Sequence, residues 1–173
     1  MKKTTLLFFI LFSISSFGQK KLNPKEFEKK REEIESLTLV NLELALQKSN
    51  SLLKYAESGK SDSEIAKAQA TLAYLKIFEA KTNEAEALNN KSLKRNAKLK
   101  NESEIAKNYF NSALIHSRKS DFVTSVGLFI KSIDLAKKNK NYILVQKNYR
   151  GLANSYCDQK NYEMALKYAL KAL

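Results

Sequence analysis

The chain has 173 residues and carries 31 Lys and Arg against 18 Asp and Glu, a formal net charge of +13 at pH 7. It contains one Cys and one His, so it can form neither an intramolecular disulfide nor a thiol–imidazole pair with a spare partner. No cluster with metal-ligand spacing, glycine-rich phosphate loop or Ser/His/Asp set occurs in the sequence. These features argue against an enzyme, and they predict no catalytic residues, no cofactor and no metal site.

Residues 1–18 show the order of regions that is typical of a secretory signal peptide. A positive start precedes an unbroken apolar run over residues 6–12, and the small residues Ser16 and Gly18 stand at the spacing that a signal peptidase reads. We therefore expect cleavage before Gln19 and a periplasmic or cell-envelope location. An uncleaved membrane anchor is the alternative, but the apolar run is shorter than the ~20 residues that a spanning helix needs.

Beyond a short linker over residues 19–23, the apolar periodicity is that of helices. Ile105, Tyr109 and Ala113, for example, follow the three-and-four spacing of one helix face. One proline and four glycines in the whole chain also favour an all-helical protein. The pattern predicts eight helices in four antiparallel pairs, at residues 24–36 and 41–58, 62–79 and 83–99, 102–118 and 122–138, and 142–158 and 162 onward.

The expected helix starts carry residues that are typical of N-caps. Ser61, Asn101 and Asn141 are evenly spaced along the chain, and each can accept a hydrogen bond from the first turn of a helix. Glu64 follows Ser61 by three residues and Glu104 follows Asn101 by three, which is the spacing of a capping box. Two further residues are expected to cap second helices: Asp121 and Asn161.

The chain repeats itself at a constant interval. The pentapeptide Ser63–Lys67 recurs unchanged as Ser103–Lys107. A step of roughly 40 residues predicts a stack of small modules, and such stacks are binding surfaces more often than enzymes. Two columns of small residues predict close approach of helix backbones: Ala45, Ala85, Ser125 and Ala165, and Ala73, Ala113 and Ala153. A column of branched apolar residues predicts one buried seam: Leu53, Leu93, Ile133 and Leu173.

The last unit carries a family pattern of aromatic and small residues at Tyr149, Leu152, Ala153, Tyr156, Ala165 and Ala172. It resembles the tetratricopeptide repeat. The resemblance implies a right-handed all-α solenoid of about four antiparallel helix pairs. Because the last expected helix is short and stops on the apolar column at Leu173, we expect the stack to be truncated at its C-terminal end. The period is about 40 residues instead of ~34, and the family's proline is absent, so other helix-pair repeats stay open. The expected repeat domain is 24–173, with units at about 24–60, 61–100, 101–140 and 141–173.

In the tetratricopeptide family the first helices of successive pairs line a concave groove that binds protein segments. In this chain, the mix of cationic and aromatic residues at the corresponding positions would suit a protein or peptide partner with an acidic segment. A subgroup of the family clamps a terminal carboxylate with Lys, Asn and Arg, which this chain matches only in part, and the alternative is that the lysines form a solvated row. By resemblance the groove takes in Lys67, Tyr74, Phe78, Lys107, Phe110, Asn111, Leu114, Lys147, Arg150 and Asn154.

The remaining cations and the single His and Cys favour structural interpretations. Lysines and arginines at the ends of second helices complement the helix dipole by ~0.3–1 kcal/mol each, and the alternative is a basic ridge that faces acidic glycans or phospholipid heads. We expect no nucleic-acid partner for an exported chain without a nucleic-acid motif. His116 is expected to be half-buried and Cys157 buried. The basic groups are Lys94, Arg95, Lys98 and Lys100, and Lys137, Lys138 and Lys140.

Two functions are compatible with these features. The first is an exported scaffold or adaptor that binds proteins through the groove. The alternative is the N-terminal periplasmic sensory region of a longer signalling protein with a histidine kinase or DNA-binding output. In that case membrane contact would come only through a part of the chain beyond Leu173.

Overall fold

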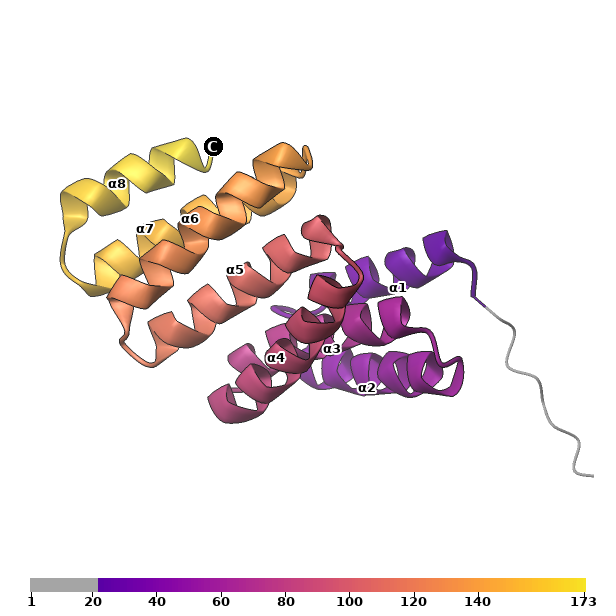
Figure 1. Cartoon of the computed structure of the whole chain (residues 1–173). Coiled ribbons are helices and arrows are strands. Elements are labelled where there is room, and N and C mark those ends of the chain that lie inside the picture. Colours follow the sequence, from indigo (N-terminus) through magenta and orange to yellow (C-terminus); the bar gives the residue numbers. More distant parts are fainter. Residues whose placement is uncertain (1–21) are drawn as a thin grey trace, which may run out of the picture.

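The structure is a computed structural model that describes residues 22–173. The predicted signal peptide and its cleavage site before Gln19 lie outside the described residues. The described part is all-α, with successive helices packed side by side as antiparallel pairs (Figure 1). Its helices are α1 (Pro24–Ser36), α2 (Leu42–Ser58), α3 (Asp62–Phe78), α4 (Thr82–Lys98), α5 (Glu102–Arg118), α6 (Phe122–Lys138), α7 (Tyr142–Asp158) and α8 (Tyr162–Lys171).

The predicted helices are confirmed to within one residue at nearly every end, because their starts are encoded locally. Seven of the eight helices begin at an Asn, Ser or Asp whose side chain accepts a hydrogen bond from the first turn. The exception is α4, whose N-cap Lys81 makes no such bond. The expected caps Ser61, Asn101, Asp121, Asn141 and Asn161 are all confirmed.

In neither of the two predicted capping boxes does the glutamate side chain bind the backbone N–H of the cap residue, so this part of the prediction is wrong. Asn101 accepts a bond from the backbone N–H of Glu104, but the Glu104 carboxylate turns away from the cap and binds Arg31. Among the helices of residues 22–173, the reciprocal pair forms only in α1, between Asn23 and Glu26. The buried Arg31 on α1 therefore binds the carboxylate that the local spacing predicted for the cap of α5.

The columns of small residues lie where two helices of a pair cross. Ala45, Ala85 and Ser125 are fully buried, and so is Ala113 in the other column. The Ser125 hydroxyl donates to the carbonyl of Ala113 at 2.8 Å, which is possible only where two backbones come close. The prediction of close backbone approach is thus confirmed for these positions.

The predicted buried seam is confirmed at Ile133, which is 6% exposed, but in the first two units the buried position lies one residue away. Leu53 and Leu93 are only half-buried, and Leu173 is 96% exposed. The buried column is instead Leu52, Ser92 and Ser132. Two of its members make the same bond in successive units: Ser92 Oγ donates to Ala66 O at 2.7 Å and Ser132 Oγ to Ala106 O at 2.8 Å. A serine fits this close crossing because its hydroxyl satisfies a buried carbonyl.

The two ends of the stack differ from its middle. α1 is joined to α2 by residues 37–41, whereas each later link spans three residues. A hollow of about 540 Å³ separates part of α1 from α2 and is lined by Leu22, Ile34, Leu44 and Tyr55 among others. At the other end, α8 has no buried residue. The regular antiparallel packing of the helices is therefore most complete over α3–α6.

Candidate functional site

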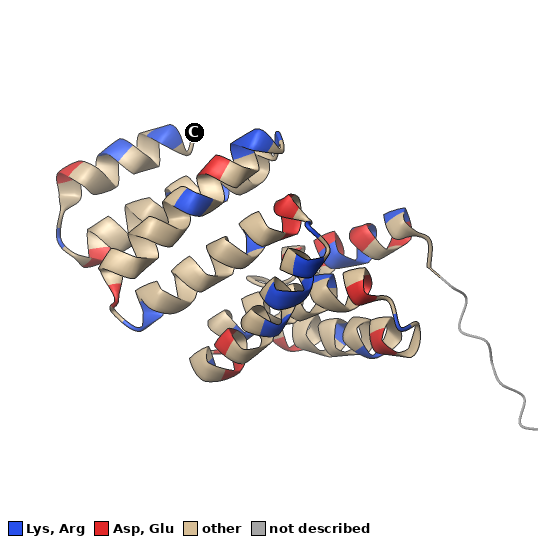
Figure 2. Ribbon diagram, in the orientation of Figure 1, with Lys and Arg blue, Asp and Glu red and all other residues tan. Residues whose placement is uncertain are grey.

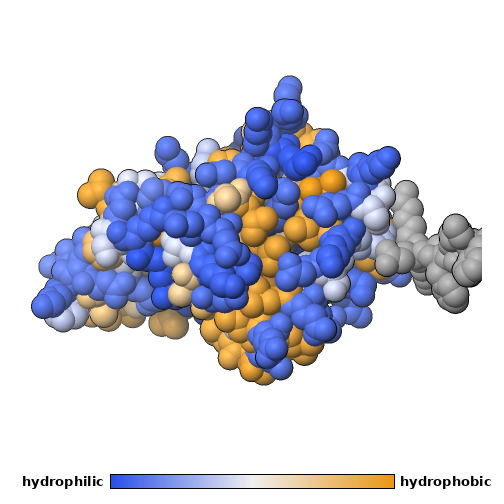
Figure 3. Space-filling model, turned by 90° about the horizontal axis from the view of Figure 1, so that it is seen from below, coloured by the Kyte–Doolittle hydropathy of each residue, from blue (hydrophilic) through white to orange (hydrophobic). Residues whose placement is uncertain are grey.

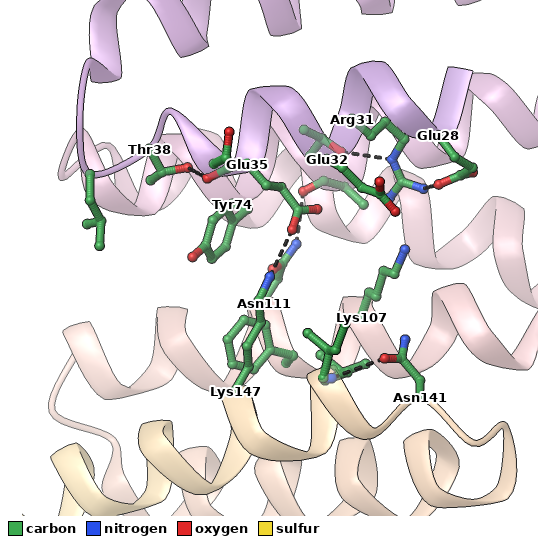
Figure 4. A pocket seen from close by; sticks show the side chains of 17 residues that line it. Glu28, Arg31, Glu32, Glu35, Thr38, Tyr74, Lys107, Asn111, Asn141 and Lys147 are labelled. Atoms are coloured by element: carbon green, nitrogen blue, oxygen red, sulfur yellow. Dashed lines mark hydrogen bonds and ion pairs between the residues drawn. The ribbon is translucent and has the colours of Figure 1, made fainter. Parts of the chain in front are cut away.

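A hollow of about 530 Å³ lies on the side of the stack that the first helices of the pairs form. α1 makes one wall and α7 the opposite wall, with α3 and α5 between them (Figure 4). The lining residues are Glu28, Arg31, Glu32, Glu35, Ser36, Thr38, Leu39, Ala70, Thr71, Tyr74, Lys107, Phe110, Asn111, Asn141, Ile143, Leu144 and Lys147.

A buried ion pair anchors α1 at this site. The Arg31 guanidinium, 2% exposed, binds both oxygens of Glu104 on α5 at 3.1 and 3.0 Å, and it donates to Thr71 Oγ1 at 3.0 Å. Burial by itself raises the pKa of Glu104, but Arg31 and Lys107 outweigh burial and lower that pKa to about 2. The bidentate geometry suits an arginine and satisfies the buried donors. Arg31 thus ties the first unit to the third.

The three groove lysines predicted from the repeat all hold carboxylates of the same chain. Lys67 pairs with Glu28 at 2.5 Å and Lys147 with Glu35 at 2.9 Å. Lys107 pairs with Glu104 at 2.8 Å. They are therefore neither a solvated row nor free cations: two of the three are neutralised by the acidic face of α1.

Aromatic side chains form the floor of the hollow next to these charges. The Tyr74 ring lies 6.2 Å from Phe110 and 5.0 Å from Phe78, between centroids. Lys147 Nζ lies 5.8 Å from the centroid of the Tyr74 ring. Burial and then the nearby Glu35 carboxylate raise the pKa of Tyr74 to about 12, so the phenol stays protonated at neutral pH. The floor is thus apolar with one hydroxyl donor.

Two exposed apolar side chains stand on opposite walls of the hollow. Leu39, just after α1, is 85% exposed, and Ile143 at the start of α7 is 70% exposed. Exposed aliphatic side chains on both walls of a recess are a common feature of binding sites. Figure 3 shows one face of the molecule, on which most of the surface is hydrophilic and apolar residues gather near the middle.

The structure brings together half of the predicted groove residues. Those that line the hollow are Tyr74, Lys107, Phe110, Asn111 and Lys147. Asn111 is 4% exposed and donates to Ala70 O at 2.9 Å, so its amide supports the helix packing. The predicted residues that do not line the hollow are Lys67, Phe78, Leu114, Arg150 and Asn154.

Sequence reasoning missed the wall that α1 contributes. Glu28, Glu32 and Glu35 follow helical spacing and lie on one face, which was a usable signal. The predicted groove included no residue of this helix. Its other face is well packed, because Phe27 and Ile34 are 1% and 3% exposed. α1 is therefore a wall of the hollow with its own buried anchor.

The basic residues at the ends of second helices, His116 and Cys157 lie outside the hollow. Figure 2 shows the cations spread over several helices and their ends, and some of them are paired: Arg95 with Asp62, and Lys138 with Glu102 at 2.8 Å. His116 is half-buried, as expected, and its Nδ1 lies 2.9 Å from Asp121 Oδ2. The expectation of a buried Cys157 is wrong, because this residue is exposed near the end of α7, where no further described helix covers it.

No protein-family model matches the chain, and no curated protein is significantly similar to it. Within residues 22–173, no group of three or more His, Cys, Asp or Glu is arranged to hold a metal ion. None of the helices in that range is long and apolar enough to span a membrane.

Proposed function

We propose that the protein is a helical-repeat scaffold that binds a segment of a partner protein in the hollow between α1 and α7. The observation that carries this proposal is the pair of exposed apolar residues on the two walls, Leu39 and Ile143, above the aromatic floor of Tyr74 and Phe110. A partner segment would bury these side chains at ~25 cal/mol per Å² of apolar surface.

The charged residues of the site favour binding over catalysis. Arg31, Glu35, Lys107 and Lys147 are held in ion pairs with residues of the same chain, so none of them is placed as a free acid or base. Among the lining carboxylates only Glu32 has no ion-pair partner in the described part of the chain. A catalytic acid or base needs a group that is free to exchange a proton with a substrate, and a scaffold does not.

We further propose that the repeat is a lengthened relative of the tetratricopeptide hairpin and that the protein acts in the cell envelope. The buried small residues at helix crossings, such as Ala85 and Ala113, support the first part. The order of charged, apolar and small residues in positions 1–18 supports the second.

The test is capture of partners from an envelope extract of the native host by the immobilised protein. Leu39→Ser and Ile143→Ser should each weaken capture, since both side chains are exposed and neither supports the core. Val123→Ser is the matched control, because Val123 is 87% exposed on α6, outside the hollow. Circular dichroism should show the same helix content in all variants. Equal capture by all three would contradict the proposal.

A further inference from the structure

One ion pair closes the hollow from wall to wall. Glu35 on α1 and Lys147 on α7 are 112 residues apart in sequence, and their charged atoms lie 2.9 Å apart. Among the hydrogen bonds between described side chains, this one alone joins α1 directly to α7. Figure 4 shows the bond crossing the space between the two helices. In the described part of the chain, this ion pair is therefore the one hydrogen-bonded link between the first helix of unit one and the first helix of unit four.

That contact can open without loss of the packing around it. Glu35 and Lys147 are 28% and 29% exposed, so water can solvate both charges. α1 itself stays in place, because the buried side chains of Phe27, Arg31 and Ile34 hold it. An ion pair that is partly open to solvent adds little to stability. Breaking this ion pair therefore costs much less free energy than detaching α1 from the stack.

Lys107 is also available, although it is paired. Its partner Glu104 keeps two bonds from Arg31 when Lys107 turns away, so the buried carboxylate stays satisfied. Lys107 and Lys147 occupy the same phase of neighbouring first helices. Packed helices lie about 8–10 Å apart, so the two ammonium groups can meet two carboxylates at a similar separation.

The size of the hollow selects the form of the ligand. An extended chain in the polyproline II conformation has three residues per turn and rises ~3.1 Å per residue, so carboxylates three residues apart lie on one face, about 9 Å from one another. A helix with its side chains is about 10–12 Å across, so a single helical turn would already fill a hollow of about 530 Å³. An extended segment with the pattern Glu-x-x-Glu therefore fits the spacing of the lysines and the space.

We propose that Glu35 is an internal competitor for an extended acidic segment, whose carboxylates take Lys147 from Glu35 and pair with Lys107. Binding then exchanges one carboxylate for another at Lys147 and releases α1 from α7. The inference rests on the proposed binding function of the hollow, and it adds the chemical class of the partner and the residue that restrains binding.

The experiment measures fluorescence polarisation of a labelled Gly-Glu-Ala-Leu-Glu-Gly peptide with the full chain. Glu35→Gln should tighten binding about three- to fivefold, because it removes a competitor of the strength of an exposed ion pair. Lys147→Gln should weaken binding about tenfold or more. Glu33→Gln is the matched control: it makes the same change of charge on the same helix, but Glu33 pairs with Lys48 outside this hollow. It should leave the affinity unchanged.

The outcomes separate this inference from the proposed function. Equal affinities for wild type and Glu35→Gln, or equal tightening by Glu33→Gln, would overturn the competitor role of Glu35. If the peptide binds no variant while Leu39→Ser and Ile143→Ser still weaken capture from the extract, the acidic ligand class fails and the binding function stands. A peptide with Gln in place of both Glu should bind more weakly, and equal binding would also reject the ion-pair exchange.

Discussion

Phe129 of α6 packs directly against Gly151 of α7. A Cβ at position 151 would lie 2.5 Å from the Cε1 and Cζ atoms of the Phe129 ring, closer than side chains pack. At the equivalent crossing one unit earlier, Asn111 Nδ2 donates to Asn89 Oδ1 at 3.3 Å. The contact between the second helix of one unit and the first helix of the next is thus made by a large and a small residue at positions 129 and 151. At positions 89 and 111 the same contact is made by two amides. In each pair, the residue type at one position therefore limits which residue types fit at the other.

The first prediction concerns this crossing. Gly151→Ala should lower the free energy of unfolding by ~1–3 kcal/mol, because the added methyl group overpacks the interface. Phe129→Leu in the same background should recover part of that loss, since it removes the clashing atoms. Gly127→Ala is the control: nothing lies within 4 Å of its Cβ position, and alanine in a helix should stabilise by ~0.5–1 kcal/mol. Urea unfolding measures all three.

The second prediction concerns the buried Arg31–Glu104 pair. Removing the Glu104 charge leaves the buried Arg31 guanidinium with one remaining carboxylate, the partly exposed Glu28 at 2.9 Å. Glu104→Gln should therefore lower the free energy of unfolding by ~3 kcal/mol, the lower end of the range for a broken buried pair. Glu102→Gln breaks the exposed pair with Lys138 and should cost ~1 kcal/mol or less. Equal losses in these two variants would contradict the assignment of Glu104 as an anchor.

The same carboxylate predicts a pH dependence. The pKa of Glu104 is lowered from 4.5 to about 2 in the folded protein. Its contribution to stability is therefore complete above about pH 4.5 and is lost as the pH falls toward 2. The difference in unfolding free energy between wild type and Glu104→Gln should shrink over that window. A difference that stays constant through that window would show that the carboxylate is not stabilised by its partners.

The fourth prediction concerns the turns. Ala80, between α3 and α4, has a φ of 61°, in the left-handed region that side chains with a Cβ disfavour. Ala80→Gly should therefore raise the free energy of unfolding by up to ~1 kcal/mol. Ala87→Gly, at an exposed position inside α4, should lower it by a similar amount. Opposite shifts in thermal midpoint would confirm the assignment, and equal shifts would contradict it.

The fifth prediction concerns the columns of the repeat and the end of the stack. Ala113→Leu, at a fully buried crossing, should cost ~1–3 kcal/mol. Leu173→Ala should change stability by less than about 0.5 kcal/mol, because Leu173 is 96% exposed. Amide hydrogens of α8, which buries no residue, should exchange faster than those of α4 and α6. Slow exchange throughout α8 would contradict this picture.

The helices and their period follow from local sequence. Asn101 and Asn141 begin their helices because an Asn side chain satisfies the free N–H groups of the next turn, an interaction within three residues. The recurrence of Ala85 and Ser125 also marks the crossings without knowledge of the partner helix, since only small residues permit close backbones. Such signals need no information on how the units are placed in space.

The tertiary structure alone decided the partners of the charges. Local spacing assigned Glu104 to its own helix cap, but a buried guanidinium binds it more strongly than a backbone N–H that water can satisfy. In the same way, the repeat predicted that Lys67, Lys107 and Lys147 lie in one row, but it did not predict which carboxylates pair with them. The pairing of Glu35 with Lys147 depends on how far four units curve, and that curvature sums small displacements at every crossing.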